Sequence, residues 1–172
     1  MTLEIAELGN PILSQHAAKV RVFAGAELAA TTQQMMLMMT ELNGVGIAAP
    51  QLSISQQIVI IASRPNQRYP DAPLMEPLVM VNPEILDQSS ETKKGWEGCL
   101  SVPGIRGYVA RSIGVEVGYM DIEGHSHQLV LDEFPARIFL HEYDHLIGLT
   151  FLDRVDSTAD LASEKELAAR LA

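Results

Sequence analysis

The sequence predicts an α+β fold in which antiparallel β-sheets pack around a central helix. Two observations carry this prediction. Apolar runs rich in β-branched residues follow one another from about residue 56 to residue 132, with turn signals between them. A helix that is apolar nearly all round then covers about 133–148 and contains the sequence HEYDH. Strands followed by a helix are typical of α+β proteins rather than of a parallel βαβ array.

The other elements are predicted from local signals. A helix is expected over 26–42, where leucine and methionine recur at helical spacing before Asn43-Gly44 ends it. The four prolines of 63–77 indicate an irregular loop, and a shorter C-terminal helix is expected over 158–171. Strands are expected at 56–62, 78–83, 105–110, 113–121 and 127–132, the last two joined by a tight turn at Glu123-Gly124.

Length and composition favour a single domain covering 1–172, because 172 residues at 47% hydrophobic content suffice for one sizeable core. No stretch approaches the roughly 18 continuous apolar residues of a membrane helix, so a cytoplasmic protein without a membrane partner is expected. The net charge of -10 opposes a nucleic-acid surface, which needs clustered Lys and Arg. A single cysteine excludes an intrachain disulfide.

The stretch FLHEYDHLIG, from Phe139 to Gly148, places four ionisable side chains in five positions among apolar neighbours. His141 and His145 are one helical turn apart and about 40° apart in azimuth, which suits chelation. Buried imidazoles and carboxylates should be paired or bound to a metal. H-E-x-x-H is the known helical form of this arrangement, in which the Glu handles the proton of a metal-bound water. The alternative is a solvated polar face with incidental histidines.

A catalytic metal site usually has three protein ligands, so a third ligand is expected outside the helix. Cys99 lies in GWEGCLSVPGIRG, whose glycines allow close backbone approach, and its thiolate would be a strong soft ligand. The alternative for this segment is an ordinary strand with bulges. His125 and His127 lie beside a predicted hairpin turn, where a surface position is favoured, and His16 has the character of a structural residue.

Three segments stand in order: GVGIAAPQ at 44–51, EGCLS at 97–101 and HEYDH at 141–145. Together they closely resemble the signature motifs of the peptide deformylase family, G-x-G-Φ-A-A-x-Q, E-G-C-x-S and H-E-x-D-H, where Φ is apolar. The resemblance extends from about residue 8 to residue 153. It implies a metal-dependent hydrolase that removes the N-formyl group from the initiator methionine of newly made polypeptides and releases formate.

The resemblance also implies a role for individual residues. Cys99, His141 and His145 match the ligands of one divalent metal ion, for which Fe²⁺ is the first expectation and Zn²⁺ or Ni²⁺ are alternatives. Glu142 matches the general base that takes a proton from water and passes it to the leaving amine. Asp144 has no role of this kind and is expected to have a buried partner, for which Arg111 is the candidate.

The implied oxyanion donors are the Gln51 side-chain amide and the Leu100 backbone N–H. Six further residues are expected to contact the N-formylmethionyl peptide. Val45, Phe134 and Ile138 are candidates for the methionine pocket, Gly46 and Ile47 for backbone pairing with the extended substrate, and Arg106 for a contact near the peptide.

Two alternatives remain on the same residues: another metal-dependent amidase or peptidase, and a non-catalytic metal-binding or peptide-binding module. Contact with the ribosome through the C-terminal segment is not favoured, because residues 154–172 contain three basic and four acidic side chains. The resemblance says least about the rim of the substrate groove. The 45 residues between Gln51 and Glu97 form a longer gap than in compact family members and include the Pro-rich loop.

Overall fold

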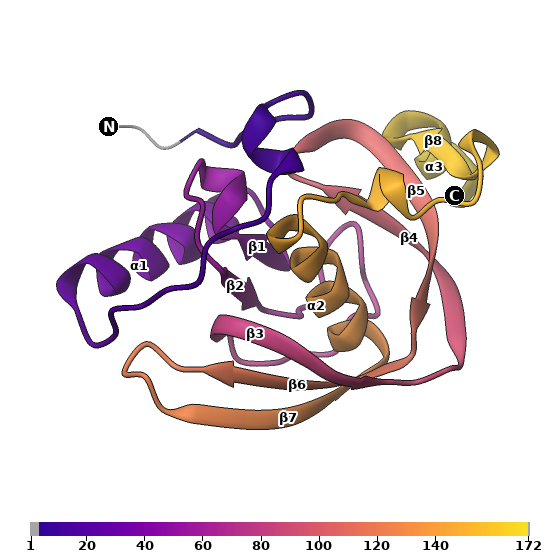
Figure 1. The fold of residues 1–172 in the computed structure, drawn as a ribbon. Coiled ribbons are helices and arrows are strands. Elements are labelled where there is room, and N and C mark those ends of the chain that lie inside the picture. Colours follow the sequence, from indigo (N-terminus) through magenta and orange to yellow (C-terminus); the bar gives the residue numbers. More distant parts are fainter. Residues whose placement is uncertain (1–3, 172) are drawn as a thin grey trace.

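The computed structural model describes residues 4–171, and within this range eight strands form two antiparallel sheets (Figure 1). The larger sheet has the strand order β1-β2-β3-β6-β7, and the smaller has the order β4-β5-β8. The α+β class expected from the sequence is confirmed. The strands are β1 (Gly46–Ala48), β2 (Ile58–Ile61), β3 (Leu78–Gln88), β4 (Thr92–Cys99), β5 (Val102–Ser112), β6 (Gly114–Met120), β7 (Ser126–Asp132) and β8 (Leu161–Ser163).

Helix α2 (Glu133–Leu146) lies in the middle of the molecule, with β4 and β5 on one side and the larger sheet on the other (Figure 1). Phe139 and Leu146 are almost fully buried and pack with residues of β2, β3, β6 and β7 in one apolar cluster. The predicted central helix is therefore present. The other helical elements are α1 (Ala26–Glu41), α3 (Glu164–Leu171) and the 3₁₀ segments η1 (Pro11–Ser14), η2 (Ala49–Leu52), η3 (Phe151–Asp153) and η4 (Thr158–Asp160).

Strand β2 is buried on both faces, which explains its unbroken apolar sequence IVII. Val59 and Ile61 belong to the cluster that contains α2, whereas Ile58 and Ile60 belong to a second cluster with Leu28, Met35 and Met39 of α1. The two helices thus cover opposite faces of the sheet. Because β1 pairs with β2 and forms the edge of the described sheet, the sheet brings the 44–51 segment next to α2.

Several expected boundaries differ from the structure by a few residues, and the larger differences concern β3, β4 and the C-terminal helix. Strand β3 continues past residue 83 to Gln88 through a register irregularity at Asn82-Pro83. The segment 92–99, for part of which a strand with bulges was expected only as the alternative, forms β4 and pairs with β5, with a register shift at Gly98-Cys99. The C-terminal helix covers only 164–171; residues 158–160 form η4, and 161–163 form β8 against β5.

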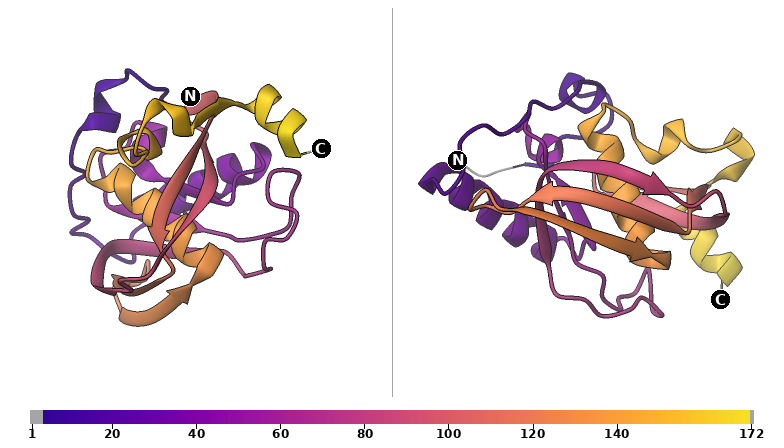
Figure 2. Two further views of the ribbon diagram at one scale, coloured as in Figure 1. Left: turned by 90° about the vertical axis from the view of Figure 1, so that its right-hand side faces the viewer. Right: turned by 60° about the horizontal axis from the view of Figure 1, so that its bottom comes forward.

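The Pro-rich residues 63–77 form an irregular loop, as predicted. Asn66 organises its tip, since the Asn66 Oδ1 atom accepts hydrogen bonds from the backbone N–H groups of Arg68 and Tyr69. In both views of Figure 2 the loop runs beside α3, and Arg68 forms an ion pair of 3.4 Å with Glu164 of that helix. In the described part of the chain, no helix combines the length and apolar character that a membrane span requires.

Candidate active site

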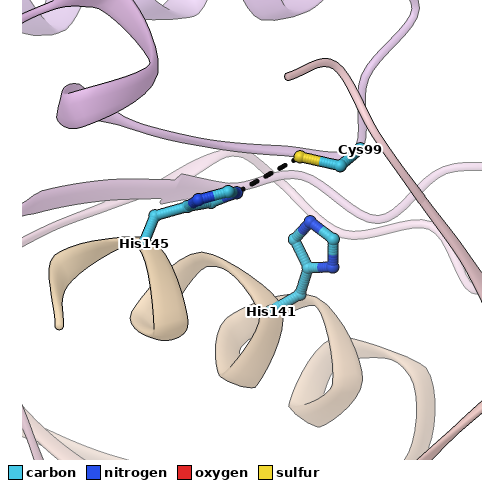
Figure 3. Close-up of side chains that lie close together, drawn as sticks. All are labelled: Cys99, His141 and His145. Atoms are coloured by element: carbon cyan, nitrogen blue, oxygen red, sulfur yellow. Dashed lines mark hydrogen bonds between the residues drawn. The ribbon is translucent and has the colours of Figure 1, made fainter. Parts of the chain in front are cut away.

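Cys99, His141 and His145 lie together in the interior, with one ligand atom of each within 4.8 Å of the others. The two histidines come from successive turns of α2, and Cys99 is the last residue of β4 above them (Figure 3). The Sγ atom of Cys99 is 3.3 Å from Nε2 of His145. A thiolate and two imidazoles at these separations fit one divalent transition-metal ion.

The charge on Cys99 is consistent with this donor set. Burial alone would raise the pKa of the Cys99 thiol, but the neighbouring His145 and His141 hold that pKa well below its usual value. The side chain is therefore stabilised as the thiolate, which is the form of cysteine that binds metals.

Glu97 orients His141, because the Nδ1 atom of His141 donates a hydrogen bond of 2.9 Å to the Glu97 carboxylate. Arg111 donates two further bonds to Glu97, of 2.9 and 3.0 Å, and Arg137 donates one of 2.9 Å. Burial raises the pKa of Glu97, but these hydrogen bonds and charges outweigh burial and lower it well below its usual value. With Nδ1 held in this way, the Nε2 atom of His141 is left for the ligand cluster.

Asp144 pairs with Arg111 at 2.6 Å, as expected from the sequence. Arg154 donates hydrogen bonds to both carboxylate oxygens of Asp144. It follows η3, and its side chain is 41% exposed. A continuous series of ion pairs thus leads from Arg154 at the surface through Asp144, Arg111 and Glu97 to His141. Buried charges are tolerated only when paired in this way.

A cavity opens beside the ligand cluster, and Glu142 and Gln51 both line it. Burial raises the pKa of Glu142 to about 7, against the lowering influence of His141 and His145. The Glu142 Oε2 atom is buried and has no hydrogen-bond partner among residues 4–171. A buried carboxylate oxygen without a partner, next to a thiolate and two imidazoles, fits a site in which a polar molecule would be held between a metal ion on these ligands and the glutamate.

Gln51 has a fixed orientation. Its Oε1 atom accepts a bond of 2.9 Å from the backbone N–H of Ala48, and its Nε2 atom points to Cys99 Sγ at 3.5 Å and Ser101 Oγ at 3.2 Å. The amide N–H groups therefore face the ligand cluster. Leu100 follows Cys99 directly and lines the same cavity.

The predicted substrate residues divide into two groups. Val45, Gly46, Phe134 and Ile138 line the cavity together with Glu142 and His141. Ile47 is fully buried in the core beside α1, and its side chain does not line the cavity. Arg106 is buried behind the cavity, with its side chain across Gly98 and its guanidinium 5.3 Å from the ring centre of Tyr69.

The cavity-lining residues that sequence reasoning missed include Arg137, Arg68 and Tyr69. Arg137 lies one helical turn before His141, so the helical spacing that identified Ile138 could also have identified it. No comparable signal marks Arg68 or Tyr69, because both lie in an irregular loop. Of the other candidate ligands, His125 and His127 lie at the exposed β6–β7 hairpin, where both bond to Asp121, and His16 bridges to Ile147 through its backbone.

The α+β fold and the buried Cys-His-His cluster beside a glutamate define this chain as a metal-dependent hydrolase. A sequence model of the family described as Polypeptide deformylase matches residues 2–160. The chain belongs to the peptide deformylase family, and it is an enzyme of that family.

Individual relatives agree with this assignment. The chain is 49% identical over 164 residues to peptide deformylase 2 of Nostoc sp., covering 95% of this chain and 92% of the relative. It is 51% identical over 152 residues to peptide deformylase 2 of Shewanella oneidensis, covering 88% of this chain and 83% of the relative. A crystal structure of the class I type b peptide deformylase from Acinetobacter baumannii with Met-Ala-Ser bound superposes with a TM-score of 0.88 at 49% identity, covering 90% of this chain and 99% of that one.

Proposed function

We propose that this chain hydrolyses the N-formyl group from the initiator methionine of newly made polypeptides, giving formate and a free amino terminus. The observation that carries the proposal is the convergence of the Cys99, His141 and His145 cluster with Glu142 and Gln51 at one cavity. The reaction needs a polarised carbonyl, a base and donors for an oxyanion, and these residues supply them.

The metal held by Cys99, His141 and His145 would polarise the formyl carbonyl and lower the pKa of water. Glu142 takes the proton of the attacking water and returns it to the leaving amine. Its pKa of about 7 suits both steps near neutral pH, since a base and an acid are most effective when their pKa is close to the operating pH. The Gln51 amide and the Leu100 backbone N–H donate hydrogen bonds to the oxyanion.

The formylated peptide lies in an extended form along the edge of β1, where Gly46 and Ile47 offer their backbone groups. Its methionine side chain enters the cavity between Val45, Ile138 and Phe134. All three side chains are apolar and line the cavity. Arg106, which is buried and does not line the cavity, is not proposed to contact the peptide. The Acinetobacter baumannii peptide deformylase structure has Met-Ala-Ser bound, and a ligand that begins with methionine supports the proposal that this chain also takes a methionyl peptide.

Fe²⁺ is the proposed metal, with Zn²⁺ or Ni²⁺ as alternatives that the same donors accept. The proposed substrates are nascent chains, so the proposed place of action is the cytoplasm, where these chains emerge from the ribosome. Stable docking on the ribosome through residues 154–172 is not proposed, because that segment is acidic on balance.

The test is formate release from a formyl-Met-Ala-Ser peptide by protein purified without oxygen and loaded separately with each metal. Turnover is expected, and loaded protein of confirmed metal content that releases no formate would refute the proposal. Glu142→Gln should keep the metal and lose about 10²- to 10⁴-fold in kcat, the usual contribution of a general base. Unchanged kcat in this variant would refute the role of Glu142 alone.

A further inference from the structure

We propose that Tyr69, on the Pro-rich loop, closes the far end of the cavity and sets the upper limit on the length of the first side chain of the substrate. The inference rests on the proposed function, because it assigns a specificity-determining residue to the same site. It concerns a part of the chain for which the sequence motifs predict nothing.

Tyr69 and Phe134 separate two hollows in the surface. The cavity beside the ligand cluster is lined at one end by both rings. A second hollow, formed by loop residues 68–72, is lined by the same two rings. The ring centres are 4.8 Å apart and the planes are inclined by 50°, so the rings are in contact and form a partition.

This partition lies at the end of the cavity away from the metal ligands. Along α2, Ile138 is about one turn before His141 and Phe134 is about two turns before it, which places Phe134 roughly 10 Å along the helix axis from His141. A side chain that enters beside His141 and extends along α2 toward Phe134 therefore meets the Tyr69 ring, which is in contact with Phe134. Its permitted length is fixed by the position of the Tyr69 ring.

Three contacts hold the ring in this position. The guanidinium of Arg106, itself only 6% exposed, lies over the Tyr69 ring at 5.3 Å from its centre, a favourable cation–π distance. The Asn66 side chain fixes the backbone of Arg68 and Tyr69. The ion pair of Arg68 with Glu164 joins the loop to α3. The ring is therefore a positioned wall, although its loop has no regular secondary structure.

The experiment compares two formylated substrates that differ only in side-chain length, formyl-norleucyl-Ala-Ser and formyl-2-aminodecanoyl-Ala-Ser, on the metal-loaded enzyme. In the wild type, kcat/KM should be far higher for the four-carbon norleucine side chain than for the eight-carbon chain. Tyr69→Ala joins the two hollows, so the ratio of kcat/KM for the long substrate to that for the short one should rise by about 10-fold or more, the scale on which a hydrophobic pocket discriminates size.

Two variants serve as controls. Tyr69→Phe keeps the ring and should keep the wild-type ratio. Tyr119→Ala removes a half-buried tyrosine that stacks on His127 at the β6–β7 hairpin and lines neither hollow, so it should also leave the ratio unchanged. Tyr69→Leu is measured beside Tyr69→Ala in case the smaller side chain prevents folding, which thermal unfolding would reveal.

The outcomes separate this inference from the proposed function. A wild-type ratio in folded Tyr69→Ala or Tyr69→Leu, together with turnover of formyl-Met-Ala-Ser, would overturn the wall but leave the deformylase activity intact. Absence of turnover of formyl-Met-Ala-Ser by the wild type would instead overturn the proposed function. A shift of the ratio in Tyr69→Ala, with no shift in either control, would support the inference.

Discussion

Gly46 lies so close to α2 that a single added carbon has no room. A Cβ atom at this position would be 2.5 Å from Oε1 of Glu142 and 2.7 Å from Cγ2 of Ile138. Both neighbours belong to the proposed chemistry, one as the base and the other as part of the methionine pocket. The absence of a side chain at Gly46 therefore keeps the Glu142 carboxylate where it can face the metal cluster.

Replacing Gly46 with Ala is expected to lower kcat/KM for a formyl-Met peptide by about 10²-fold, since a displacement of about 1 Å in a catalytic group has an effect of that size. Steady-state kinetics at matched metal content would measure it. Gly118→Ala is the matched control, because a Cβ atom there would first meet Leu86 at an ordinary distance of 3.4 Å. Equal kinetics for the two variants would contradict the steric argument.

The sequence predicted residues of this site where a short motif fixes them and missed those that distant segments contribute. The GVGIAAPQ motif indicated that Gly46 offers its backbone to a ligand, and the spacing of His141 and His145 indicated chelation. The involvement of Tyr69 depends on how a 15-residue loop folds back, which neither helical nor strand periodicity encodes. The partner of Asp144 was predicted, but the contribution of Arg154 to the same carboxylate was not.

Strand β3 passes through an irregular point where Asn82 acts as a connector between elements. Asn82 has a positive φ of 49°, and its side chain accepts a bond of 2.8 Å from the Val20 N–H and donates one of 2.9 Å to the Val20 carbonyl. The Asn82 side chain thus makes the two backbone hydrogen bonds with Val20 that a neighbouring strand would otherwise make with the N-terminal segment. This explains why the predicted strand 78–83 could continue through Asn-Pro to Gln88.

Asn82→Ala should lower the free energy of unfolding by about 3 to 4 kcal/mol, from two lost hydrogen bonds of about 1 kcal/mol each and a left-handed backbone cost of about 1 to 2 kcal/mol. Asn82→Gly loses the same hydrogen bonds without the left-handed cost and should be less destabilised. Urea unfolding would measure both variants. A larger loss for Gly than for Ala would show that backbone strain at this position is unimportant.

The elements that sequence reasoning misplaced are those that tertiary pairing creates. Strand β4 begins with three polar residues, Thr92 to Lys94, and contains glycines. Neither an alternation of polar and apolar residues nor high β-propensity therefore marks it as a strand. Its conformation is determined by pairing with β5. Strand β8 interrupts the expected C-terminal helix for the same reason. Helices α1 and α2 were predicted well because their apolar spacing is local.

At the scale of the molecule, the proposed metal site joins the two sheets. Cys99 belongs to the smaller sheet, whereas the two histidines belong to α2, which packs on the larger one. We propose on this basis that residues 1–172 form one domain, since neither sheet has a complete site without the other. The bound metal would then stabilise the contact between the sheets as well as the reaction.

Removal of the metal should therefore lower the melting temperature. A ligand present at 1,000 times its Kd stabilises a fold by about 4 kcal/mol, which for a chain of this size corresponds to about 10 °C. Thermal unfolding before and after chelation, and after metal is restored, would measure the change. Cys99→Ala should show a much smaller response to chelation, and an equal response in that variant would locate the stabilising metal elsewhere.

The separation of the site residues along the chain also has a consequence for biosynthesis. Gln51 precedes Cys99 by 48 residues, and Cys99 precedes His145 by 46. During its own synthesis the protein presents the oxyanion donor first, the thiolate next and both imidazoles last, because chains emerge from the N-terminus. The metal can find its full set of ligands only after α2 has been made and packed, so an enzyme that we propose acts on other nascent chains cannot become competent before its own synthesis has passed residue 146.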